Sequence, residues 1–109
     1  GLFTLHDPAG GVPLIRLASR AGEAGEITTA HRDGHPLVAL AASPDGEGQV
    51  FTFAPDGDLL TAIAPITTGP AVRLHDPTGE TAITLEIGPE GRPRIGVRSP
   101  DGGVRWLTP

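Results

Sequence analysis

Apolar and polar residues alternate along short segments of the chain, and turn-forming sequences separate these segments. Ile83, Leu85 and Ile87 fall on one side of an extended strand, with polar residues between them. The same alternation recurs in residues 3–5, 51–53, 72–74, 95–97 and 104–106. A period of two with one apolar side predicts β-strands that have one wet face.

Two segments, 37–42 and 59–64, are apolar on both sides. They are short and bounded by turn signals, which favours buried strands over helices. No segment carries a helical stripe of apolar residues, and the frequent Pro and Gly would interrupt one. The pattern therefore predicts an all-β protein.

Nine turn-like tetrads that end in Gly punctuate the chain. They occupy residues 7–10, 22–25, 31–34, 43–46, 54–57, 66–69, 76–79, 88–91 and 99–102. In the Ser-Pro-Asp-Gly and Asp-Pro-Thr-Gly forms, the first side chain can accept backbone hydrogen bonds and Pro presets φ for a type I turn. The closing Gly tolerates positive φ, so each tetrad predicts a hairpin with a glycine bulge.

Every second tetrad ends at a position that repeats about every 23 residues, at Gly10, Gly34, Gly57, Gly79 and Gly102. We therefore predict one domain, residues 1–109, of about ten short antiparallel strands in an up-and-down meander of hairpins. A sheet with one apolar face must close as a barrel, fold into two packed sheets or bury that face against another copy, and we expect a barrel or a sandwich. Because the aromatic content is only Trp106 and three Phe, the core is thin, and the edges or the apolar face are expected to contact a partner.

The stretch from Val72 to Gly79, Val-Arg-Leu-His-Asp-Pro-Thr-Gly, and the stretch from Ile95 to Gly102, Ile-Gly-Val-Arg-Ser-Pro-Asp-Gly, resemble bacterial RHS/YD-type repeats. The resemblance lies in the strand, D-x-x-G, strand rhythm; the chain has no Tyr before the Asp. It implies a β-sheet shell that encloses or displays other polypeptides without catalysis. Ser43-Pro44-Asp45-Gly46 also resembles the turns of β-propeller blades, for which this chain would supply two and a half blades.

Composition narrows the function classes. The 109 residues include no Cys, so disulfides, thiolate metal sites and cysteine nucleophiles are absent. The net charge is −5 and every basic residue is Arg, without the basic patch that a nucleic-acid partner requires. No apolar run approaches the roughly 20 residues of a membrane span, so we expect no membrane partner. The cellular compartment stays unassigned.

Two adjacent His–Asp pairs, His6-Asp7 and His75-Asp76, occupy the same place in two repeats. A His beside a carboxylate can act as a base or bind a metal. The alternative, which we prefer, is that the Asp begins the turn and the His ends a strand. His31 and His35 flank another turn and would supply only two metal ligands. We therefore expect no metal and no cofactor.

Turn acids form a further candidate. Asp56 and Asp58, with Asp45 and Glu47 one hairpin away, resemble an oxygen-rich Ca²⁺ loop, but they lack its ligand spacing. We interpret them as solvated turn residues. The chain also lacks G-x-S-x-G, phosphate-cradling and H-E-x-x-H motifs, so we expect it not to be an enzyme.

Arginines gather in the last third of the chain. Arg94 and Arg98 are four residues apart on one strand and share a face. They are expected to pair across strands with Glu80, Glu86 or Glu90; alternatively they form a binding surface with Arg105 and Trp106. A lone Trp in a small β-domain usually belongs to the core. We predict a non-catalytic structural or protein-interaction module that contacts a protein partner or itself, with a small-ligand or carbohydrate-binding domain as the alternative.

Overall fold

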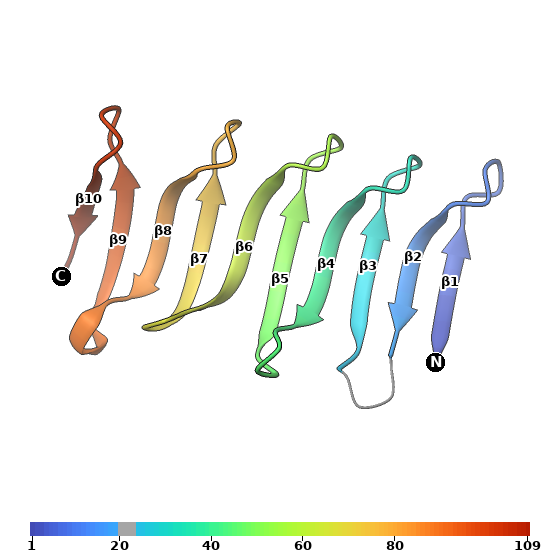
Figure 1. Cartoon of the computed structure of the whole chain (residues 1–109), viewed down its shortest axis with the longest axis horizontal. Helices are drawn as coiled ribbons and strands as arrows, with labels where there is room; N and C mark the ends of the chain where they lie inside the picture. Colours follow the sequence, from blue (N-terminus) through green and yellow to red (C-terminus); the bar gives the residue numbers. More distant parts are fainter. Residues whose placement is uncertain (20–23) are drawn as a thin grey trace.

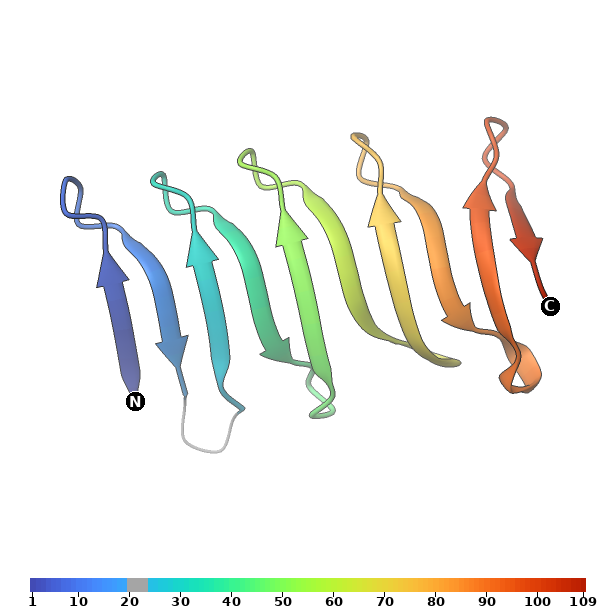
Figure 2. The same cartoon turned by 180° about the vertical axis from the view of Figure 1, so that it is seen from behind.

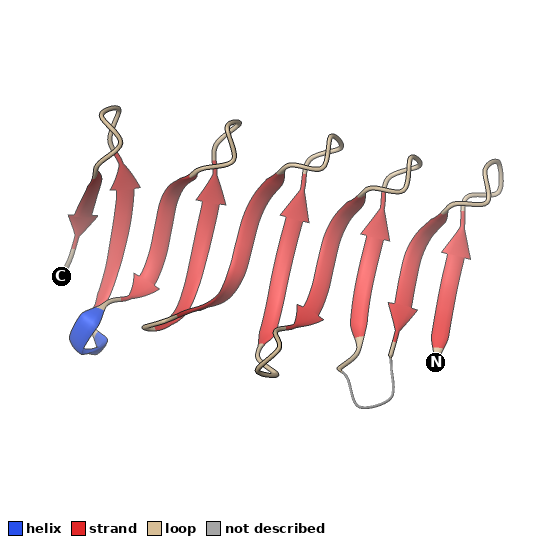
Figure 3. Cartoon of the chain, in the orientation of Figure 1, coloured by secondary structure: helices blue, strands red, loops and turns tan. Residues whose placement is uncertain are grey.

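The computed structural model, which describes residues 1–19 and 24–109, is a single sheet of ten antiparallel strands in the order of the sequence (Figure 1). The strands are β1 (Leu2–His6), β2 (Pro13–Ala18), β3 (Glu26–Ala30), β4 (Pro36–Ala42), β5 (Gly48–Phe53), β6 (Leu59–Ile66), β7 (Gly69–His75), β8 (Thr81–Ile87), β9 (Pro93–Arg98) and β10 (Val104–Leu107). One turn of 3₁₀ helix, η1 (Pro89–Gly91), joins β8 to β9 (Figure 3). The predicted ten-stranded meander is confirmed.

The sheet is open, whereas the sequence led us to expect a barrel or a sandwich. β1 and β10 form opposite edges of the one layer, which measures 49 × 33 × 18 Å (Figure 2). Strands that are consecutive in the sequence are neighbours in the sheet, and no strand in the described residues lies in a second layer. Alternation specifies which side of a strand is apolar, but an open sheet, a barrel and a sandwich share that alternation. The sequence pattern therefore could not fix closure.

The tetrads form the predicted turns at most of the hairpin ends. In residues 76–79, the Gly79 amide donates to the Asp76 carbonyl, and the Asp76 amide donates to the Glu80 carbonyl. Gly79 has φ 87°, and the closing Gly of the tetrads 31–34, 43–46, 54–57 and 99–102 is likewise left-handed. These bonds describe a type I turn followed by a glycine bulge.

Four tetrads depart from the predicted geometry or lie partly outside the described residues. The first turn is one residue longer, so Gly11 rather than Gly10 has positive φ. Residues 66–69 form a tighter hairpin in which Ile66 pairs with Gly69. Residues 88–91 adopt the 3₁₀ turn, where Glu90 also has positive φ. The tetrad 22–25 begins in the undescribed residues 20–23.

The 23-residue repeat is visible in the strand register. Four hairpins, those of β1–β2, β3–β4, β5–β6 and β7–β8, each contain one unpaired residue near the turn. These unpaired residues are Leu14, Leu37, Leu60 and Ala82, spaced 23, 23 and 22 residues apart. Since an added residue increases the local twist, each of these four hairpins bends its second strand near the turn, as Figure 1 shows.

Candidate functional site

An unbroken row of large apolar side chains crosses one face of the sheet. Residues directly opposed on neighbouring strands point to the same face, so the register carries one face from β1 to β10. The row contains Phe3, Leu17, Ile27, Leu40, Val50, Ile63, Val72, Leu85, Ile95 and Leu107, one residue from each strand. We call these ten residues the apolar row and the face that carries them the apolar face.

A second row lies beside the first on the same face, two residues nearer to the β1–β2 turn. It consists of Leu5, Ile15, Thr29, Val38, Thr52, Thr61, Leu74, Ile83, Val97 and Arg105. Of the twenty side chains in the two rows, only Arg105 is charged, and it lies on the edge strand β10. Thr52 and Thr61 hydrogen-bond to each other through their hydroxyls at 2.6 Å, so one of the two hydroxyl hydrogens is donated within the chain.

The apolar row is accessible rather than buried. Ile63 is 49% exposed at the centre of the sheet, and most other members of the row are also exposed. Two shallow grooves contain the whole row: one is lined by its members from β1 to β5 and the other by its members from β6 to β10. Only three hydrophobic residues in the described chain are buried, and all three are Ala. The large apolar side chains therefore form a surface and not a core.

The opposite face, which we call the mixed face, covers itself. Ala62, with 0% exposure, stands between Phe51 and Arg73, its direct neighbours on the flanking strands. Ala64 and Ala71 are opposed to each other and are also buried. Small residues beside longer ones let the longer side chains lie flat over the sheet, which removes apolar surface from water within the chain.

The mixed face also carries cross-strand ion pairs. The Arg94 Nε donates to Glu86 Oε1 at 2.8 Å, and these two residues are direct partners on β9 and β8. At the other end of the sheet, Arg16 on β2 pairs with Glu26 on β3 at 2.5 Å. The predicted cross-strand pairing of Arg94 with Glu86 is confirmed.

The predicted binding residues are divided between the two faces. The Arg94 guanidinium stacks on the Trp106 ring at 3.6 Å from the ring centroid. Trp106 opposes Gly96 and lies on the mixed face at the β10 edge, 39% exposed, so it is not a core residue of this sheet. Arg98 shares that face, whereas Arg105 lies on the apolar face. A binding role for Arg94, Arg98, Arg105 and Trp106 stays a prediction.

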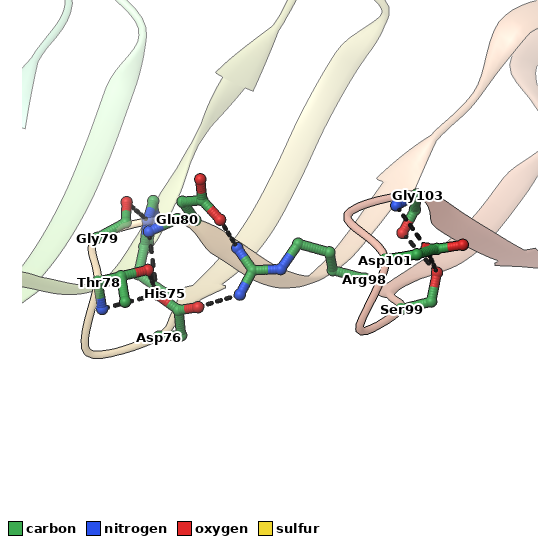
Figure 4. Close-up of polar contacts among 9 residues, drawn as sticks. All are labelled: His75, Asp76, Thr78, Gly79, Glu80, Arg98, Ser99, Asp101 and Gly103. Atoms are coloured by element: carbon green, nitrogen blue, oxygen red, sulfur yellow. Dashed lines mark hydrogen bonds and ion pairs between the residues drawn. The ribbon is translucent and has the colours of Figure 1, made fainter.

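Arg98, at the end of β9, connects the β9–β10 hairpin to the neighbouring β7–β8 turn (Figure 4). From the end of β9 its guanidinium contacts both Asp76 and Glu80 in the β7–β8 turn. The hydrogen bond from the Thr78 hydroxyl, together with the Arg98 contact, lowers the pKa of Asp76 well below its usual range. Asp76 in turn raises the pKa of Arg98. A longer ion pair joins the turns of the first two repeats: Arg32 Nε lies 3.5 Å from Asp7 Oδ2.

The Asp of each His–Asp pair serves the turn, as we preferred. Asp76 accepts from the backbone amides of Thr78 and Glu80, and Asp7 accepts from the amide of Ala9. In the described residues, neither His6 nor His75 forms a hydrogen bond or ion pair with its adjacent Asp; His75 contacts the Gly79 carbonyl instead. This arrangement provides no assembled acid–base pair.

The metal candidates are also separated. His31 contacts Asp33 at 3.1 Å, and hydrogen bonding from the His35 amide lowers the pKa of Asp33. No group of three or more His, Asp or Glu side chains is placed to hold a metal in the described part of the chain. Asp56 and Asp58 lie in the β5–β6 turn, whereas Asp45 and Glu47 lie at the other end of β5. The four acids therefore do not form one site.

The sequence contained a signal for the apolar row that the alternation alone did not reveal. Five members fall on even-numbered strands, Leu17, Leu40, Ile63, Leu85 and Leu107, and they are spaced 23, 23, 22 and 22 residues apart. The same spacing that repeats the turns thus repeats one large apolar residue per strand. Only the register, however, shows that all ten lie side by side.

No helix in the described residues has the length and apolar composition needed to cross a membrane. Comparison of the sequence with models of protein families and with curated proteins found no match. The features that bear on function are therefore those of this chain itself: an open sheet, one self-covered face and one apolar face.

Proposed function

We propose that the chain is a non-catalytic structural module that contacts another polypeptide through its apolar face. The observation that carries the proposal is the apolar row, ten large side chains that continue from edge to edge without a charge. Exposed apolar patches of more than a few hundred Å² are rare on monomeric proteins and mark contact surfaces.

Energetics support the same proposal. A domain is normally stabilised by burying one face of its sheet against a second layer. Here no large side chain among the described residues is fully buried. Covering the apolar face with another polypeptide would supply the missing hydrophobic stabilisation, at about 25 cal/mol for each Å² removed from water.

The test is the binding of an anilinonaphthalene sulfonate dye at high dilution of the protein. We expect dye fluorescence with the unmodified chain, and weaker fluorescence for Ile63→Glu, which places a carboxylate in the middle of the apolar row. The matched control is Val104→Glu, because Val104 is 52% exposed, close to Ile63 at 49%, but lies on the mixed face. Absence of dye binding from a dilute, folded chain would contradict the proposal.

A further inference from the structure

We infer that the polypeptide covering the apolar face is a second copy of this chain, packed face to face so that two open sheets form a sandwich. This inference rests on the proposed function and names its partner. Three properties of the face support it: its area, its charge and the symmetry of its rows.

The area of the face is sufficient for a stable dimer. The whole chain, turns included, extends 49 Å by 33 Å, an outline of about 1,600 Å², whereas a specific interface of standard size buries about 800 Å² on each partner. An interface that covers half of that outline would satisfy the requirement. A second copy also matches the first in length and width, so it leaves no part of the row uncovered.

The charge distribution favours contact between two copies through the apolar face. The chain carries a net charge of −5, but the two rows of the apolar face contain Arg105 as their one charged side chain. The mixed face instead contains Glu26, Glu86, Arg16 and Arg94. Taking charged side chains out of water is costly even when they are paired, and the apolar face, whose one charge lies on the edge strand, largely avoids that cost.

The rows are complementary to themselves under two-fold symmetry. An axis parallel to the strands, between β5 and β6, would place β1 of one copy opposite β10 of the other. Leu40 would then face Val72, and Leu17 would face Ile95, so that apolar residues meet across the interface. At the centre, the hydroxyls of Thr52 and Thr61 hydrogen-bond to each other, which lowers the cost of burying them. Interfaces of this isologous kind are the commonest in homo-oligomers.

The first test is the mass by light scattering over a range of protein concentrations. We expect the mass to rise from the 11.2 kDa of one chain to twice that value. Ile63→Glu places two carboxylates near the axis in apolar surroundings and should weaken the association by about 100-fold or more. Leu107→Glu, on the edge strand, should weaken it less, and Val104→Glu on the same strand should leave it unchanged.

A cross-linking measurement keeps the test decisive if Ile63→Glu fails to fold. Because the chain contains no Cys, Ile63→Cys introduces its only thiol. Packed sheets lie about 10 Å apart, and a bismaleimide of that reach should link two Ile63→Cys chains into a dimer. Gln49→Cys, on the mixed face of the adjacent strand β5, is the control and should not be linked.

The outcomes separate this inference from the proposed function. A mass of 11.2 kDa at every concentration together with dye binding would overturn the second copy as occupant and leave the contact function standing. Equal cross-linking of Ile63→Cys and Gln49→Cys would also overturn the face-to-face arrangement. A dilute, folded chain that neither binds dye nor self-associates would overturn both.

Discussion

The two faces of this sheet use the same backbone in opposite ways. On the mixed face, buried Ala residues lie beside longer side chains, and Arg94 and Arg16 have carboxylate partners within the chain. On the apolar face, the large side chains of both rows have neighbours along the sheet but no residue of the described chain packed over them, and Ile63 is 49% exposed beside Ala62 at 0%. The difference teaches that the chain covers much of one face with its own side chains and leaves the large side chains of the other exposed, and it is for this second face that we propose a partner.

The largest expected effect comes from a comparison of two Gly→Ala substitutions, one on each face of the sheet. A Cβ at Gly96, on the mixed face, would meet Trp106 at 2.7 Å and Thr84 at 2.8 Å. Such overpacking should lower the free energy of unfolding of Gly96→Ala by about 1–3 kcal/mol. Gly48 lies on the apolar face, where a Cβ would meet nothing within 4 Å. Gly48→Ala should therefore be neutral or stabilising by less than about 1 kcal/mol. Urea unfolding measures the free energy of unfolding of both variants. Equal destabilisation of the two would contradict the difference in packing between the faces.

The next effect separates the two ion pairs of the mixed face. The side chains of Glu86 and Arg94 are 8% and 25% exposed, whereas those of Glu26 and Arg16 are each 40% exposed. Glu86→Gln leaves a largely buried guanidinium without its counter-charge and should cost about 1–2 kcal/mol of unfolding free energy. Glu26→Gln should cost less than about 0.5 kcal/mol. If chemical denaturation gives the two variants the same loss of unfolding free energy, burial does not determine how much each ion pair stabilises the chain.

The smallest expected effect is the loss of stability in acid that comes from Asp76 in the β7–β8 turn. The pKa of Asp76 is lowered from its ordinary 3.8, so its contribution to stability is complete above about pH 4 and is lost as the pH falls further. We expect the urea midpoint of the unmodified chain to fall over that acidic range and the midpoint of Asp76→Asn to fall less. If the urea midpoints of the two proteins fall in parallel with pH, Asp76 does not cause the loss of stability in acid. The apolar face has no carboxylate and should not share the response.

The fold was largely predictable from local chemistry, and the site was only half predictable. The Pro-Asp-Gly turns and the alternation of Ile83, Leu85 and Ile87 specify the hairpins because both signals act within a few residues. Closure depends on how far β1 lies from β10, which no local signal encodes. The apolar row likewise needs the register of nine strand pairs, and the bulges at Leu14, Leu37, Leu60 and Ala82 shift that register within the hairpins.

Arg98 illustrates the remaining limit. Its place on a strand with Arg94 was predictable, but its contact with Asp76 joins residues 22 apart in the sequence. Such a contact depends on two hairpins standing side by side with their turns level. Similarly, the lone Trp106 suggested a core residue, yet in an open sheet it covers Gly96 at the edge.

Solvent access to the methyl groups of β6 is the most direct test of the open, one-sided sheet. Ile63 and Ala62 are adjacent in the chain but point to opposite faces, and a soluble paramagnetic agent can distinguish their methyl NMR signals. At high dilution we expect strong relaxation of the Ile63 methyls and little relaxation of Ala62. At high concentration Ile63 should become protected as well. Protection of Ile63 in a dilute monomer would show that the sheet closes on itself, and it would contradict the account.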